Sequence, residues 1–238
     1  MITRAVEEAR RIFKRLMTYV TYRTAMSLNI MVFVVLASLV YGIFPLTAIM
    51  LVLLALLNDV PITTIAYDQA EVEPQPLRWN KHQVFTVTGV LGVLSIMESF
   101  GLLALGMEYW HLDSAHLRSM MFLQLVSSAQ LLLLVNRSRK PFWFKPLPSW
   151  QLALAIAATQ LLGVLMAGFG WLIPALPWWL IGGVWGYNLL WMVVLDLVKL
   201  ALYRLMEGRE FRGVFADHLQ AHLRHANQPV QTSPGVAR

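Results

Sequence analysis

Six long apolar stretches constrain this chain more than any other feature of its sequence. They fall near residues 20–41, 45–66, 84–107, 117–136, 150–173 and 178–203. A helix needs roughly 20 apolar residues to cross a hydrocarbon core about 30 Å thick, and each stretch supplies them. Runs this continuous lack the alternation of barrel strands. Because a backbone in lipid must satisfy its own polar groups, the sequence predicts an all-α, polytopic membrane bundle of six transmembrane helices.

The composition favours the same class of protein. Of the 238 residues, 58% are hydrophobic and 13% are charged, which leaves too little polar surface to coat a soluble protein. The chain has no cysteine, which excludes disulfides, thiolate metal sites and cysteine nucleophiles. The net charge of +6 would suit a nucleic-acid partner, but the placement of the basic residues gives a simpler explanation. We therefore expect the lipid bilayer as a partner, and no nucleic acid.

The basic residues lie on one side of the predicted spans. They precede the first span, occupy the loops after the second and fourth spans, and follow the sixth: Arg4, Arg10, Arg11, Lys14, Arg15, Arg78, Lys81, Arg137, Arg139, Lys140, Lys145, Arg204, Arg209 and Arg212. The opposite loops, near 42–44, 108–116 and 174–177, contain no lysine or arginine. The positive-inside rule therefore predicts that both termini are cytoplasmic.

The same reading divides the chain into three parts. Residues 1–19 are predicted to form a cytoplasmic helical stalk, 20–207 the transmembrane segment and 208–238 a polar cytoplasmic tail, a short helix followed by disorder. In the tail, His218, His222 and His225 have helical spacing. A solvated helix face is favoured over a metal site, because no carboxylate or cysteine cluster completes one. We expect no bound metal.

Asp59 is the main candidate for chemistry. It lies in LVLLALLNDVPITTIAYD at 51–68, a stretch otherwise apolar enough to cross a bilayer. A carboxylate in hydrocarbon is costly, so it faces a protein interior or a water-filled path. Pro61 lacks an amide hydrogen and deprives the Leu57 carbonyl of its helical partner, which predicts a helix break around Asn58 and Asp59. Transporters use such breaks at ion sites, whereas the alternative is a simple proline kink.

Other polar residues in the spans are secondary candidates. Thr63 and Thr64 either supply hydroxyls to an ion or bond back to backbone carbonyls. Glu98 either ionises or stays protonated against a neighbour, and Asp196 with Lys199 is best explained as a local ion pair with a snorkelling lysine. The amides are expected to form contacts between helices: Asn29, Gln124, Gln130, Gln160 and Asn188. For Asn29 the alternative is that it orients Asp59 as part of the ion site.

Four segments together resemble one protein family. They are RRIFKRLMTYVTYR at 10–23, LLALLNDVPITTIAYDQ at 53–69, RSRKPFW at 137–143 and DLVKLALYR at 196–204. They are similar, in order and with the same loop lengths, to the last six membrane helices of the P-type proton-pumping ATPases of plasma membranes. The likeness covers nearly the whole chain up to about Arg212, and the second segment is its most specific motif.

The resemblance assigns roles to residues of this chain. In that family the sixth membrane helix carries an aspartate after an asparagine or a similar residue, and the aspartate accepts the proton. This implies proton binding by Asp59, with Asn58 beside it. The family often has a basic residue in the fifth helix that interacts with the aspartate, and the aligned position here is Asn29, a neutral amide. A single carboxylate also suits a proton better than a divalent cation.

The resemblance also implies what lies elsewhere. The family's phosphorylated aspartate in DKTG, its TGES loop, its nucleotide domain, its GDGxND hinge and its first four membrane helices have no counterpart in this chain. ATP and Mg²⁺ are therefore expected only on those missing domains, with no cofactor in this chain, and the missing N-terminal part of the pump is the expected partner.

The leading hypothesis is thus the proton-translocating segment of an ATP-driven pump, a translocase by resemblance. The alternative is a non-catalytic truncated membrane protein, or a regulatory or assembly partner of an intact pump. A stand-alone channel or carrier is least favoured, because no inverted repeat is evident. The expected location is multi-pass in the plasma membrane, and the short polar tail favours a prokaryotic inner membrane.

Overall fold

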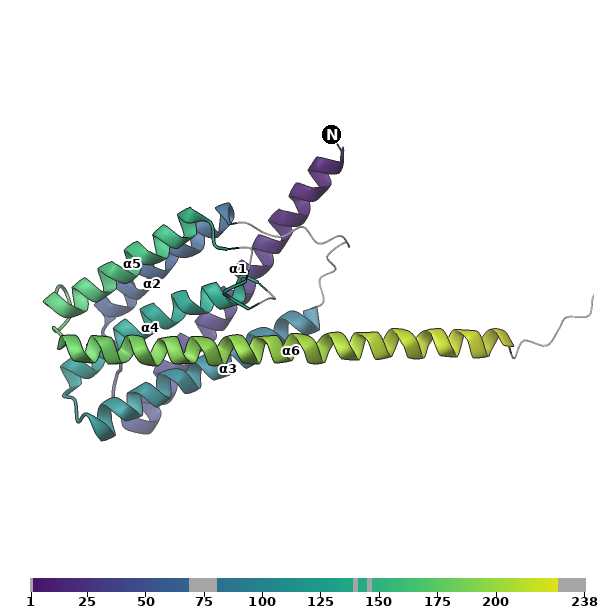
Figure 1. Cartoon of the computed structure of the whole chain (residues 1–238). Helices are drawn as coiled ribbons and strands as arrows, with labels where there is room; N and C mark the ends of the chain where they lie inside the picture. The colour runs from purple at the N-terminus through teal and green to yellow at the C-terminus, as the bar shows by residue number, and fades with distance from the viewer. Residues whose placement is uncertain (1, 69–80, 139–140, 145–146, 227–238) are drawn as a thin grey trace, which may run out of the picture. The chain divides into compact units, whose positions relative to one another are not determined.

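The computed structural model describes residues 2–68, 81–138, 141–144 and 147–226, without the side chains of 2–5, 81–84 and 207–226. The described chain is helical throughout its regular structure and contains no strand, which confirms the all-α prediction. Its elements are α1 (Ile2–Tyr41), α2 (Ala48–Thr64), the 3₁₀ turn η1 (Ile65–Tyr67), α3 (Lys81–Ala104), the π turn η2 (Leu105–Tyr109), α4 (Ser114–Asn136), α5 (Trp150–Phe169) and α6 (Trp178–Ala226), shown in Figure 1.

Five stretches of the described chain are long and apolar enough to cross a membrane: Val6–Tyr41, Ala48–Tyr67, Phe85–Tyr109, Ser114–Asn136 and Trp150–Phe169. They match the first five predicted spans. The sixth predicted span, 178–203, lies within α6, and its passage through the membrane stays a prediction, as does the cytoplasmic side of both termini. The predicted stalk is the first part of α1, which runs into the first span without interruption.

The chain divides into two compact units, residues 1–200 and 201–238. In the second unit the described part is a single helical continuation of α6 that ends at Ala226. The predicted tail is therefore helical over 208–226, and its predicted disordered end, 227–238, lies outside the described residues. The side chains of His218, His222 and His225 are also outside the description.

Local capping explains where several helices begin and end. Thr47, Asp113 and Ser149 precede α2, α4 and α5, and each side chain accepts a hydrogen bond from a backbone N–H of the first turn. α5 ends earlier than the predicted span because Gly170 adopts the left-handed conformation (φ 75°) and donates to the Met166 carbonyl. These signals fix the helix ends within the apolar stretches.

α4 is the central helix of the first unit. The apolar window of α4 is 89% buried, against 28% for α1, so nearly every face of α4 meets another helix. It packs against α1, α2, α3 and α5, while α1 packs along α3 and α2 along α5. The core around it is apolar and includes Phe33, Met50, Leu103, Phe122 and Leu180. Polar side chains on α4 therefore face protein, not lipid.

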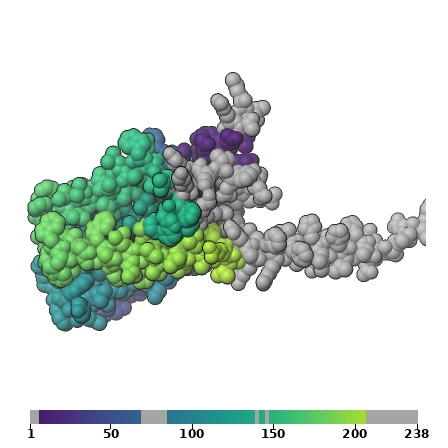
Figure 2. All heavy atoms as spheres, viewed as in Figure 1, coloured from purple at the N-terminus to yellow at the C-terminus, as the bar shows by residue number. Residues whose placement is uncertain are grey.

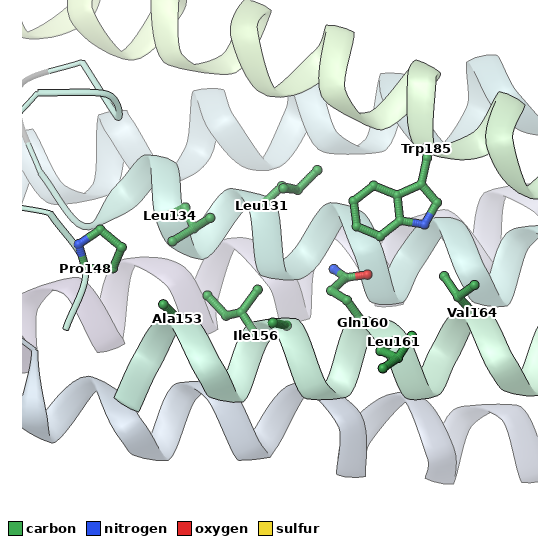
Figure 3. Close-up of a pocket in the computed structure, with 10 residues that line it drawn as sticks. Leu131, Leu134, Pro148, Ala153, Ile156, Gln160, Leu161, Val164 and Trp185 are labelled. Carbon is green, nitrogen blue, oxygen red and sulfur yellow. The ribbon is translucent and has the colours of Figure 1, made fainter. Parts of the chain in front are cut away.

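Side chains of α5 and α6 make up much of the face seen in Figure 2. Between α4, α5 and α6 lies a hollow of about 440 Å³, shown in Figure 3. Trp185 extends from α6 toward α5, and Gln160 extends from α5 toward it. The Gln160 amide is bonded to Ser127, since its oxygen accepts from the Ser127 hydroxyl at 3.0 Å. The remaining lining is apolar, so the hollow lacks the oxygen ligands of a cation site.

Candidate functional site

The candidate site centres on Asp59 in α2. Arg23 of α1 donates from Nη1 to Asp59 Oδ1 at 2.8 Å, a charge-assisted hydrogen bond between two predicted spans. The two side chains are 42% and 49% exposed, so the pair lies at the surface of the described bundle. Asp59 thus has a built-in positive partner, which the sequence reasoning missed. The available signal was Arg23 itself, a cation placed inside the apolar stretch 20–41.

Asn29, the position aligned with the family's basic residue, is not that partner. It is buried, and its Oδ1 lies 3.4 Å from the Ser99 hydroxyl of α3, which also has the Ser95 carbonyl at 3.0 Å. This is the interhelical role that the sequence favoured. Among the described residues, the polar contact of Asn29 is therefore with Ser99 and not with Asp59. The positive charge beside Asp59 belongs to Arg23, which lies earlier in α1.

The predicted helix break at Pro61 is wrong. α2 is continuous from Ala48 to Thr64, with Pro61 inside it. The physical reason lies on α4, where Gln130 donates from Nε2 to the Leu57 carbonyl at 3.2 Å. Gln130 thereby replaces the missing amide of Pro61, and its own oxygen lies 3.1 Å from the Thr159 hydroxyl of α5, which also has the Ala155 carbonyl at 2.7 Å. The hydrogen bond from α4 thus stabilises α2 one turn from the proline.

Asn58 and Thr63 differ in what they offer to the site. Asn58 is 1% exposed, and both atoms of its amide lack a hydrogen-bond partner among the described residues. Buried amides are usually bonded, so Asn58 keeps a free donor and acceptor beside Asp59. Thr63 instead bonds back to the Val60 carbonyl at 2.8 Å, and Thr64 to the Pro61 carbonyl at 2.7 Å. The back-bonding alternative predicted for the threonines is confirmed.

No protein-family model matches this chain. It is 36% identical over 207 residues to a cation-transporting ATPase of Methanocaldococcus jannaschii, a match that covers 87% of this chain and 26% of that protein. It is 33% identical over 170 residues to plasma membrane ATPase 2 of Saccharomyces cerevisiae, over 70% of this chain and 18% of that protein. The plasma membrane ATPase of Kluyveromyces lactis is 30% identical over 175 residues, 70% of this chain and 19% of its own length.

The chain is homologous to the membrane segment of the P-type cation-transporting ATPases. This confirms the family resemblance. The chain spans about a quarter of the length of the first of these relatives and less of the others. Together with the apolar helices, the homology identifies a multi-pass membrane protein that corresponds to the membrane portion of a cation pump.

A second arginine and aspartate pair lies beyond the end of α2. Asp68 follows η1, and Arg137 follows α4. Arg137 donates from Nε to Asp68 Oδ2 at 2.5 Å, and the Ser149 amide donates to Asp68 Oδ1 at 3.0 Å. Arg15 of α1 donates to the Asp68 carbonyl at 2.8 Å. The sequence reasoning missed this cluster, because Asp68 follows an apolar stretch and looks like a loop residue.

α1 therefore contacts the α2 and η1 segment through two arginines. Arg23 binds the Asp59 carboxylate and Arg15 binds the Asp68 backbone. The earlier arginine meets the later aspartate, which is the order expected of neighbouring antiparallel helices. Any rotation or shift of α1 thus acts on both ends of the segment that carries the candidate site.

The ion pair predicted for Asp196 and Lys199 is confirmed, whereas the predicted snorkelling is wrong. Lys199 Nζ lies 2.6 Å from Asp196 Oδ1, and the two side chains are buried. Lys199 also donates to the Val135 carbonyl at 2.8 Å, and Asp196 accepts from the Phe142 amide at 3.3 Å. The C-terminal end of α4 supplies the acceptor that water would otherwise provide, so the lysine stays inside the protein.

Glu98 is the remaining carboxylate within the predicted spans. It lies on α3 and is 1% exposed, and Ser128 of α4 donates to its Oε2 at 2.8 Å. Among the residues whose side chains are described, no group of three His, Cys, Asp or Glu has metal-binding geometry. The carboxylates of the segment therefore occupy separate environments.

Proposed function

We propose that this chain is the proton-translocating part of an ATP-driven cation pump, and that Asp59 accepts the transported proton. The observation that carries the proposal is the 2.8 Å contact between Arg23 and Asp59 within two apolar helices. A nearby positive charge favours the ionised carboxylate, and its withdrawal in an apolar setting favours the protonated acid. Movement of Arg23 relative to Asp59 would thus load and unload the proton.

The residues around the pair support a proton as the ion. Asp59 is the single carboxylate at the site, and its contact is a guanidinium, which would repel a metal cation. The free amide of Asn58 is suited to hydrogen-bond a neutral carboxyl or a water molecule. Phosphorylation, ATP and Mg²⁺ belong in this proposal to other domains of the pump, and the segment that carries them is the proposed partner.

ATP-driven proton transport tests the proposal. The chain is purified from its native membrane together with any ATPase that copurifies, and acidification is measured in proteoliposomes. Asp59→Asn should abolish acidification, because an amide cannot take up the proton. Thr63→Val, one turn further along the same helix, is the matched control and should leave acidification unchanged, since its hydroxyl only bonds back to Val60.

Two results would overturn the proposal. Undiminished acidification by the Asp59→Asn protein would exclude Asp59 as the acceptor and favour a regulatory role for the chain. Transport of another cation without proton movement would exclude the proton as the ion.

A further inference from the structure

Glu98 lies in a closed polar site that is separate from Asp59. Three helices surround it: it belongs to α3, the Ser128 hydroxyl of α4 donates to its Oε2, and the Tyr187 hydroxyl of α6 donates to its backbone carbonyl at 2.7 Å. Gly101 makes the approach of Tyr187 possible, because a Cβ at Gly101 would lie 2.6 Å from the tyrosine oxygen. In the described part of the chain, no lysine, arginine or histidine pairs with Glu98.

Two amides on the neighbouring helices are buried without a hydrogen bond of normal geometry to a described residue. They belong to Gln124 of α4 and Asn188 of α6, and only Gln124 is in reach of the Glu98 carboxyl group. Gln124 is fully buried and lies beside the Glu98 carboxyl group, one turn before Ser128 on the same face of α4. Asn188 directly follows Tyr187 and is equally buried. Buried amides are usually hydrogen-bonded, so an amide without a partner calls for a water, an ion or a protonated group at the site.

The absence of a paired cationic side chain among the described residues favours a proton on Glu98 over a metal ion. An ionised carboxylate buried without a cation is strongly disfavoured, whereas a carboxylic acid is neutral and gains one O–H donor. Ser128 donates to Glu98 Oε2 at 2.8 Å, and the Gln124 side chain beside the carboxyl group has an amide oxygen that can accept from the O–H of the protonated acid. A divalent metal would want several charged oxygen ligands, and Glu98 supplies one.

We infer that Glu98, Ser128 and Gln124 form a second proton-binding site in the membrane segment, which holds an exchangeable proton on the Glu98 carboxyl group. Glu98 binds the proton, and Ser128 and Gln124 position it. This inference stands on its own geometry and does not require that Asp59 be the transported proton's acceptor.

Infrared spectroscopy of the full chain in lipid nanodiscs tests the inference. A protonated carboxyl group has a carbonyl stretch that an ionised one lacks. We expect such a band at neutral pH, its loss in Glu98→Gln, its retention in Asp59→Asn, and a shift on transfer to D₂O. Glu98→Asp is the second variant and should restore a band at a shifted frequency, which separates loss of the acid from loss of the fold.

A positioning variant sharpens the result. Gln124→Leu removes the acceptor for the acid proton without touching Glu98, so the band should persist and move to a higher frequency. Three outcomes would overturn the inference: no difference between the parent and Glu98→Gln spectra, a band that does not respond to D₂O, or a band that disappears when sodium or potassium is added. The last would identify a site for a monovalent cation.

Discussion

Two arginine and aspartate pairs bind the segment formed by α2 and η1. They have the same chemistry but differ in burial and in the number of hydrogen bonds that each carboxylate accepts. The Arg23 and Asp59 pair is nearly half exposed, and the Asp59 carboxylate makes one hydrogen bond among the described residues. The Arg137 and Asp68 pair is about 5% exposed, and its carboxylate also binds the Ser149 amide. A group that exchanges a proton needs access and few competing bonds, whereas a group that joins helices needs enclosure. The difference fits the proposed proton exchange at Asp59 and a role for Asp68 in joining helices.

The largest expected effect is on the enclosed pair. Arg137→Met leaves Asp68 as a buried charge without its cation, which should lower the free energy of unfolding by about 3–5 kcal/mol. The matched variant Arg23→Met breaks the half-exposed pair and should cost less than Arg137→Met, because its carboxylate is not enclosed by protein. Both are measured by denaturant unfolding of the detergent-solubilised chain. Equal losses in the two variants would erase the distinction between the pairs.

A smaller loss of unfolding free energy is expected at Gln130, whose side chain donates to the Leu57 carbonyl that Pro61 leaves without a helical partner. Gln130→Leu leaves the Leu57 carbonyl buried and unpaired, at a cost of about 1–3 kcal/mol. Pro61→Ala restores an amide that can bond this carbonyl within the helix. In the double variant the loss caused by Gln130→Leu should therefore shrink, and the unfolding free energies of the four proteins give the coupling. Strict additivity would show that Gln130 does not replace the proline amide.

The smallest effect is expected at an exposed charge before α4, outside the spans. A hydrogen bond from His116 lowers the pKa of the Asp113 carboxyl below its ordinary value. A lowered pKa means that the folded state favours the carboxylate, so the stabilisation is present above the ordinary aspartate pKa and is lost as the pH falls through the folded one. Asp113→Asn, which keeps the helix cap, should be slightly less stable than the parent at neutral pH and equal to it in strong acid. Thermal unfolding at both pH values checks this, and a difference independent of pH would contradict it.

Hydropathy alone predicted the helices of this fold, because a lipid environment leaves the backbone few alternatives. The apolar stretches contain α2 through α5 with errors of a few residues, mostly where caps or Gly170 end a helix. The sequence also identified Asp59 as a costly charge. Local chemistry was sufficient for these inferences.

The partners of the site residues could not be predicted in the same way. Gln130 is 73 positions from Leu57, and Arg137 is 69 positions from Asp68, so no local pattern connects them. The helix break expected at Pro61 failed because a distant side chain supplies the missing donor. Arg23 was within reach of the sequence, since an arginine inside an apolar stretch carries the same cost as an aspartate. The pairing of the two depends on how α1 meets the α2 and η1 segment in the folded bundle.

The length of α1 has a mechanical consequence. It is one helix of 40 residues, about 60 Å long at 1.5 Å per residue, and no glycine or proline interrupts it. A rod of this kind has no hinge between the predicted stalk and Arg23. A tilt or twist of its N-terminal end would therefore displace the guanidinium beside Asp59.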